Sequence, residues 1–171
     1  MKPERKIIVI VILTSVILYA VALCVPAIQN HVLFKAGDVC PDDFTCVTID
    51  SIFYAITSSE SWAGWEAMLN GLLFGPFQLN FAGYANLFLW AGWVVLLIEK
   101  KRAAIWFFSI AGILTLQTFQ LYINAFPMDE GVVKWGSLAG LQTGYYLWIA
   151  AIVIPLIAAV NLRRKQLAQG G

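Results

Sequence analysis

Long apolar runs alternate with short polar segments along this chain of 171 residues. Four runs approach the roughly 20 residues that a helix needs to cross the hydrocarbon core of a bilayer, which is about 30 Å thick. They cover about residues 7–25, 79–98, 103–126 and 145–162. The pattern predicts an all-α integral membrane protein, a bundle of four transmembrane helices that forms one membrane domain over residues 1–171.

The segment at residues 27–78, between the first two runs, is too long for a simple connection and too short for a separate domain. Its first half is predicted as a loop. In its second half Thr57-Ser58-Ser59-Glu60 has the spacing of a helix-capping box. Apolar residues then recur at helical spacing: Trp62, Trp65, Leu69 and Leu72 or Leu73. We expect an amphipathic helix at about residues 60–74, lying in the outer headgroup layer, with a lid docked over the bundle mouth as the alternative.

Two prolines interrupt the apolar runs. Pro26 is expected to stop the first span. Pro155 lies inside the fourth span, where it removes one backbone donor and is expected to kink the helix near Ala151. Such a kink can act as a hinge, but fitting the shape of neighbouring helices is the simpler interpretation.

Composition supports the membrane assignment, since 60% of the residues are hydrophobic and only 12% are charged. Nine of the eleven Lys and Arg residues form three clusters, at residues 2–6, 100–102 and 163–165. With four spans all three clusters fall on one face, which the positive-inside bias assigns to the cytoplasm. Both termini are therefore predicted to be cytoplasmic.

Eight of the ten acidic residues then lie on the outer face. Among them, Glu66, Asp129 and Glu130 could attract cations to the mouth of a channel. No charged residue falls in the middle of a predicted span, however, and ion-coupled transport usually needs one there. We expect recognition or chemistry outside or within the membrane rather than in the cytoplasm.

Aromatic side chains collect near the ends of the predicted spans. On the outer side, Trp62, Trp65, Trp135 and Trp148 are candidate anchors. The amphipathic ring of Trp favours the headgroup level, so these residues are typical of a membrane interface.

The polar residues within the spans are amides and hydroxyls. Gln117, Gln120 and Asn124 recur at i, i+3 and i+7 on one face of the third span, and Asn86 lies at a comparable depth in the second. Facing lipid they would cost free energy, so they should point into the bundle or towards another subunit. Contacts between helices, a partner-binding seam, and a polar pore or ligand pocket are the three alternatives for this set.

Cys40 and Cys46 flank a five-residue segment on the predicted outer side, which is an oxidising compartment. The spacing favours a structural disulfide. A redox pair is the alternative, but quinone-linked thiol oxidases use a Cys-x-x-Cys pair and normally a second pair, whereas the remaining Cys24 stands alone.

Several chemistries lack the residues that they need. His31 is the only histidine, so bis-histidine haem ligation cannot be built within one chain. The sequence also has no G-x-x-x-x-G-K-[ST] phosphate loop. We expect no cofactor, no metal site and no nucleic-acid partner.

Four short strings resemble the landmarks of short, uncharacterised bacterial four-span inner-membrane proteins. They are Gly64-Trp65-Glu66-Ala67-Met68, Tyr84-Ala85-Asn86-Leu87, Asp129-Glu130-Gly131 and Gly144-Tyr145-Tyr146-Leu147-Trp148. The resemblance implies a multi-pass protein of the bacterial inner membrane. It implies no activity and no catalytic residue.

The sequence thus favours a non-enzymatic accessory or assembly subunit of a membrane complex. Its expected partners are the lipid bilayer and either other membrane subunits or a second copy of the chain. A small transporter or channel with an acidic outer mouth is the alternative, and a thiol-redox membrane enzyme is a third hypothesis.

Overall fold

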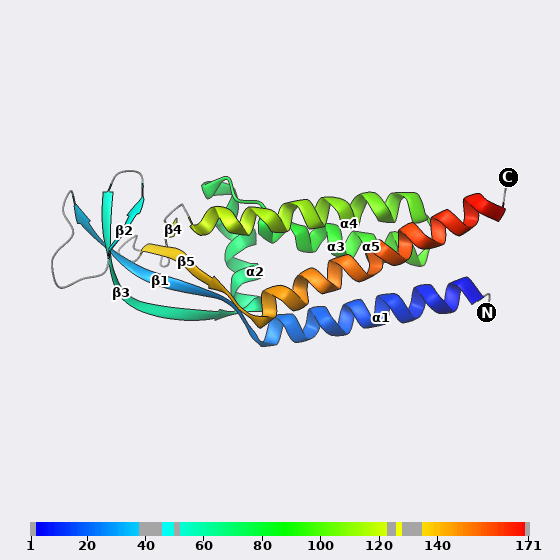
Figure 1. Ribbon diagram of the computed structural model, residues 1–171, viewed down its shortest axis with the longest axis horizontal. Helices are drawn as coiled ribbons and strands as arrows, with labels where there is room; N and C mark the ends of the chain where they lie inside the picture. Colours follow the sequence, from blue (N-terminus) through cyan, green and yellow to red (C-terminus); the bar gives the residue numbers. More distant parts are fainter. Residues whose placement is uncertain (1–2, 38–45, 50–51, 123–125, 128–134, 170–171) are drawn as a thin grey trace.

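A helix bundle and a small β-sheet follow one another along the long axis of the molecule (Figure 1). The computed structural model describes residues 3–37, 46–49, 52–122, 126–127 and 135–169. Both termini lie at the end of the bundle far from the sheet (Figure 1). We call this end the basic end, because the three cationic clusters at residues 5–6, 100–102 and 163–165 belong to it, and the opposite end the sheet end.

The bundle is built from α1 (Pro3–Cys24), α3 (Ala85–Leu97), α4 (Lys101–Thr115) and α5 (Thr143–Gln169). Among the described residues, three helices are long and apolar enough to cross a membrane: Pro3–Cys24, Lys101–Leu121 and Thr143–Ala168. The remaining apolar helix, Ala82–Leu97, would extend only about 24 Å at 1.5 Å per residue. The prediction of helices long and apolar enough to cross a membrane is confirmed for these three, and the helix at the expected second span, 79–98, is shorter than a full crossing.

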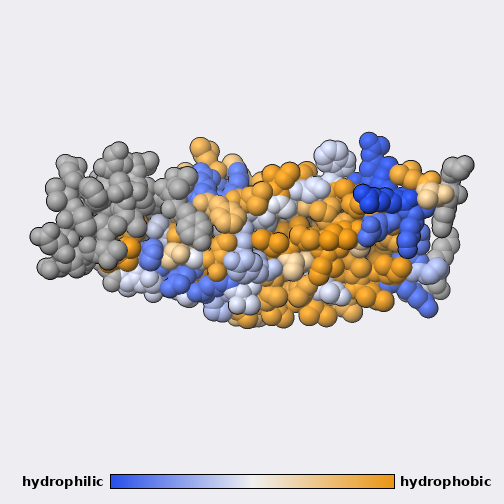
Figure 2. All heavy atoms as spheres, viewed as in Figure 1, coloured by the Kyte–Doolittle hydropathy of each residue, from blue (hydrophilic) through white to orange (hydrophobic). Residues whose placement is uncertain are grey.

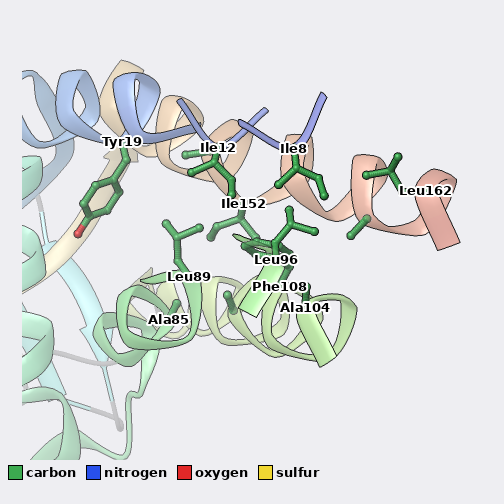
Figure 3. Close-up of a cluster of buried hydrophobic side chains, with 13 residues drawn as sticks. Ile8, Ile12, Tyr19, Ala85, Leu89, Leu96, Ala104, Phe108, Ile152 and Leu162 are labelled. Carbon is green, nitrogen blue, oxygen red and sulfur yellow. The ribbon is translucent and has the colours of Figure 1, made fainter. Parts of the chain in front are cut away.

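The middle of the bundle is a dense apolar core shared by all four helices (Figure 3). Ile8 of α1, Leu89 and Leu96 of α3, Phe108 of α4 and Ile152 of α5 are almost completely buried. Gly92 of α3 leaves the space that the Phe108 ring fills, since a Cβ on Gly92 would lie 2.5 Å from that ring. Large side chains therefore close this part of the bundle.

A polar contact among α1, α3 and α5 is built into the same core. Pro155 has no N–H, so the carbonyl of Ala151 loses the donor that it would have in a regular helix. The Ser15 hydroxyl donates to that Ala151 carbonyl instead, and the indole Nε1 of Trp93 donates to Ser15 Oγ at 2.8 Å. A neighbouring helix thus satisfies the group that the proline exposes, which makes Pro155 compatible with an apolar environment.

An ion pair joins two helices at the basic end. Lys101 is buried at the start of α4, where a cation is unfavourable beside the positive end of the helix dipole. Its Nζ lies 2.8 Å from Glu4 Oε2 of α1, and this carboxylate offsets the unfavourable position. Figure 2 shows hydrophilic residues gathered at this end and apolar residues over the middle of the bundle.

The all-α prediction is wrong at the sheet end, where five antiparallel strands form one sheet in the order β2-β3-β1-β5-β4. The strands are β1 (Pro26–Gly37), β2 (Cys46–Ile49), β3 (Ile52–Ala63), β4 (Phe126–Pro127) and β5 (Trp135–Leu141). Pro26 ends the first helix as expected, but it opens a strand, a position that tolerates its missing N–H. Residues 27–37 and 46–49 of the predicted loop therefore belong to the sheet, whereas residues 38–45 lie outside the described residues.

The central strand β1 shows why this segment pairs as a sheet. Ile28, Asn30 and Val32 alternate along it and are buried, as expected from the period of two of a strand. Ala27 and Leu33 are buried as well, at two of the places where the pairing register with β3 shifts. Asn30 is completely buried, and neither its side-chain oxygen nor its nitrogen has a hydrogen-bond partner in the described part of the chain. One polar group in the sheet core is therefore unsatisfied.

The helix expected at about residues 60–74 is present as α2 (Gly64–Leu73), but it starts later than residue 60. Thr57-Ser58-Ser59-Glu60 lies in β3, so the expected capping box is wrong. Glu66 caps the helix instead, because its Oε2 accepts the Ala63 N–H at 2.8 Å. Short 3₁₀ turns follow, η1 (Gly75–Gln78) and η2 (Ala82–Tyr84), and α2 runs across the bundle axis at the sheet end (Figure 1).

Candidate ligand pocket between the helices and the sheet

A pocket with a volume of about 100 Å³ lies where α2 crosses the sheet end of the bundle. Its wall combines segments that are far apart in the sequence, from α1, β1, β3, α2, both 3₁₀ turns, α3, α5 and the 3₁₀ segment η3 (Leu116–Tyr122) that continues α4. We call this space the junction pocket. Its lining includes Tyr19, Leu23, Ile28, Trp62, Ala67, Met68, Gly71, Phe74, Gly83, Asn86, Leu121, Tyr145 and Trp148.

Glycines bring the backbones around the junction pocket into direct contact. A Cβ on Gly64 would lie 2.0 Å from the Ala22 carbonyl oxygen, so the start of α2 rests on the end of α1. A Cβ on Gly83 would lie 2.4 Å from the backbone carbon of Gly71, where α2 crosses η2. Close approach at these two points holds α2 over the end of the bundle.

Both polar atoms of the Asn86 amide are hydrogen-bonded within the wall. Its Nδ2 donates to the Gly83 carbonyl at 2.8 Å, and its Oδ1 accepts from the Trp148 indole Nε1 at 3.0 Å. The Tyr145 hydroxyl donates to the Thr115 carbonyl at 3.1 Å. These bonds join η2, α3, α4 and α5 around the pocket.

A second set of hydrogen bonds fixes the residues between η1 and η2. Asn80 Nδ2 donates to the Gln117 carbonyl at 3.1 Å, and Asn80 Oδ1 accepts the Ala82 N–H at 3.0 Å. The side-chain Oε1 of Gln117 accepts the Phe81 N–H at 2.8 Å. The connection between α2 and α3 is therefore held on η3 by amide groups.

On the α2 side the polar atoms are likewise paired. The Tyr19 hydroxyl contacts Met68 Sδ at 3.1 Å, and Asn70 Nδ2 donates to the Glu66 carbonyl at 3.0 Å. The Tyr19 ring also packs edge-on against Trp90 and Trp93. The surface left to a ligand is consequently mostly hydrocarbon and aromatic carbon.

Of the four polar residues that the sequence placed within the spans, three lie within the described residues. Asn86 lines the junction pocket, and Gln117 lies next to it. Gln120 is half-buried in η3, where three residues per turn place it directly beyond Gln117 rather than on an α-helical stripe. Asn124 lies outside the described residues.

Only some of the candidate acids and cysteines lie within the described residues. Glu66 caps α2, whereas Asp129 and Glu130 lie outside the described residues. Cys40 is also outside them, and Cys46 begins β2, so the expected disulfide stays a prediction. Cys24 ends α1 as an exposed free thiol.

The four candidate tryptophan anchors are similarly divided. Trp62 and Trp148 line the junction pocket, and Trp65 is exposed on α2. Trp135 begins β5. Two of the four therefore contribute to a pocket wall.

Sequence reasoning missed the small residues that shape the junction pocket. Gly64, Ala67 and Gly71 recur at i, i+3 and i+7, so they form one face of α2, and this face lines the pocket. The repeat of small residues was the available signal. It does not by itself show which backbone lies opposite.

Comparison with models of known protein families found no match, and searches of curated proteins and of solved structures found none either. Within the described ranges, no group of three His, Cys, Asp or Glu side chains could hold a metal ion. The local geometry is therefore the basis for a functional conclusion.

Proposed function

We propose that this protein is a non-enzymatic membrane protein that binds an apolar ligand in the junction pocket. It would act as an accessory subunit of a complex in the bacterial inner membrane. The observation that carries the proposal is an apolar pocket in whose wall the polar groups of Asn86, Tyr145 and Trp148 are already hydrogen-bonded within the protein. Such a wall favours a hydrocarbon surface over a polar or charged ligand, because a polar group placed there would lose its hydrogen bonds to water.

The volume of the junction pocket limits the size of the ligand that can bind there. Apolar cavities of about 150 Å³ in protein cores take up a molecule the size of benzene. At about 100 Å³, the pocket suits one ring or a short stretch of a chain. With the basic end in the cytoplasm, the pocket would lie near the outer surface of the membrane.

Photolabelling with a small aryl diazirine tests this function in lipid nanodiscs. The probe is expected to label buried Tyr19 and its neighbour Met68, both of which line the pocket. An Ala67→Phe variant should lose this labelling, because the new ring would occupy the pocket. Ala20→Phe is the matched control, since Ala20 is exposed on α1. Equal labelling of Tyr19 and Met68 in both variants would contradict the proposal.

The accessory role needs a separate measurement. We expect native mass spectrometry of the protein, gently extracted from its own host, to show a stoichiometric membrane-protein partner. Extraction as a monomer under several mild detergents would argue against this role while leaving the binding function intact.

A further inference from the structure

Helix α2 is apolar on two opposite faces. One face, with Ala67, Met68 and Gly71, lines the junction pocket. The other face carries Trp65, Leu69 and Leu73 at a spacing of four residues, and all three side chains are exposed. A helix that only covered a pocket would be expected to present polar residues outwards. The outward apolar face therefore calls for a second apolar environment.

The apolar surface continues beyond α2. Phe77 of η1 is 86% exposed, and Leu79 is also largely exposed. Leu79 has a φ of 54°, a left-handed conformation that costs a non-glycine residue free energy. Backbone hydrogen bonds from Leu79 N to Pro76 O and from Asn80 N to Gly75 O hold this turn. The turn thus keeps two large apolar side chains at the surface in a conformation that is not intrinsically favoured.

The outward surface and the junction pocket meet at Phe74. This side chain lines the pocket and is also 40% exposed, so it lies at the rim between the two. The neighbouring Leu73 belongs to the outward face of α2. Apolar side chains therefore continue from the outward face of α2, at Leu73, to the rim of the pocket, at Phe74.

The direction of α2 fits a lipid environment for its outward face. α2 runs across the bundle axis (Figure 1), so in a bilayer crossed by the bundle it would lie in the membrane plane. A helix in this orientation buries its apolar face at the boundary between headgroups and acyl chains. The exposed apolar surface of the bundle in Figure 2 continues towards the same end.

We infer that the ligand of the junction pocket is the hydrocarbon chain of a membrane lipid, which enters from the adjoining leaflet past Phe74. This inference rests on the proposed binding function and names its ligand. The chain supplies the apolar surface that the wall accepts, and only a short stretch of it needs to enter the pocket. The lipid headgroup stays outside, at the exposed side of α2.

The test uses a phospholipid that carries a diazirine in one acyl chain, with the full-length protein in nanodiscs. Labelling of Tyr19 and Met68 is expected in the unaltered protein. It should fall by about tenfold in Ala67→Phe, because losing about two buried methylene groups weakens binding by about that factor. Ala20→Phe should keep the labelling. Ala67→Leu provides a smaller change if the Phe variant does not fold, and circular dichroism monitors folding.

The Phe74→Trp variant tests the route by which the lipid chain enters, because the larger side chain narrows the rim of the junction pocket. Lipid labelling of Met68 should fall, while labelling by the small aryl diazirine should persist. Undiminished lipid labelling in this variant would overturn entry past Phe74. If the small probe reaches Met68 but the lipid labels only Trp65, Leu69 and Leu73, the lipid inference fails and the proposed binding function stands. If neither probe reaches Tyr19 or Met68, both fail.

Discussion

The middle of the bundle and its sheet end use glycine in opposite ways. Around Gly92 the missing side chain is replaced by the ring of Phe108, and the core is closed. Around Gly71 and Gly83 the missing side chains let two backbones touch, and the space beside them stays open as the junction pocket. The difference shows that close backbone contact can hold elements in place without filling the volume between them.

The two regions also differ in whether their buried polar groups have hydrogen-bond partners. In the bundle, the carbonyl freed by Pro155 has its partner in Ser15. In the sheet, the buried amide of Asn30 has none among the described residues. The buried amide in the sheet should therefore lower the stability of the protein, whereas the hydrogen bond of Ser15 should raise it. Substitutions at the two positions test this difference.

The largest effect is expected for Gly83→Ala. The new Cβ would lie 2.4 Å from the Gly71 backbone, so α2 or η2 must move, and overpacking of this kind costs about 1–3 kcal/mol, with the upper end expected here. The free energy of unfolding in mixed micelles measures the loss. Gly112→Ala is the control, since a Cβ there meets nothing within 4 Å. Equal losses in the two variants would show that the contact between α2 and η2 is not the cause.

A double-mutant cycle on Ser15 and Pro155 probes the closed core. Ser15→Ala leaves the Ala151 carbonyl and the Trp93 indole without their partner, and should destabilise the protein by about 1–2 kcal/mol. In a Pro155→Ala background the residue at 155 regains its N–H and can bond to Ala151, so Ser15→Ala should cost less. Additive unfolding free energies would mean that Ser15 does not compensate for Pro155.

Asn30→Leu should raise the free energy of unfolding, whereas the substitutions at Gly83 and Ser15 should lower it. An unsatisfied buried amide carries a desolvation cost, so an apolar side chain of similar size should raise the free energy of unfolding by about 1 kcal/mol. Thermal unfolding followed by circular dichroism measures the change. A loss of stability would instead show that the amide has a partner in the folded protein.

The smallest effect is expected for Glu66→Gln. The amide oxygen can still accept the Ala63 N–H, so the cap should weaken by only about 0.5 kcal/mol. Diazirine labelling of Met68 should not change. This variant also separates the binding hypothesis from the channel hypothesis, in which neutralising Glu66 would abolish a cation flux into liposomes.

The sequence indicated the helical regions well because helix formation is local. The apolar runs that became α1, α4 and α5 are readable from composition and length, since each backbone bond closes within four residues. α3 was less predictable, because its start depends on how Asn80 and Gln117 hold the preceding turn. The start of α2 was misjudged because the Thr and Ser residues that suggested a cap lie in β3, where Ser58 and Ser59 pair with β1.

The sheet and the pocket depend on contacts between distant residues. Gln29 pairs with Ser61 on one side and with Gly140 on the other, and no local pattern specifies both partners. Likewise, the small-residue face of α2 becomes a pocket wall only because Gly83 and the end of α1 lie opposite it.

The sequence by itself determined the apolar helices and the separation of cationic from acidic segments, because hydropathy and charge act residue by residue. Only the tertiary structure decided that residues after the first helix form a sheet, that α2 crosses the bundle, and that a pocket lies beneath it. The physical reason is that strand pairing and close backbone packing need complementary partners, and these partners are far apart along the chain.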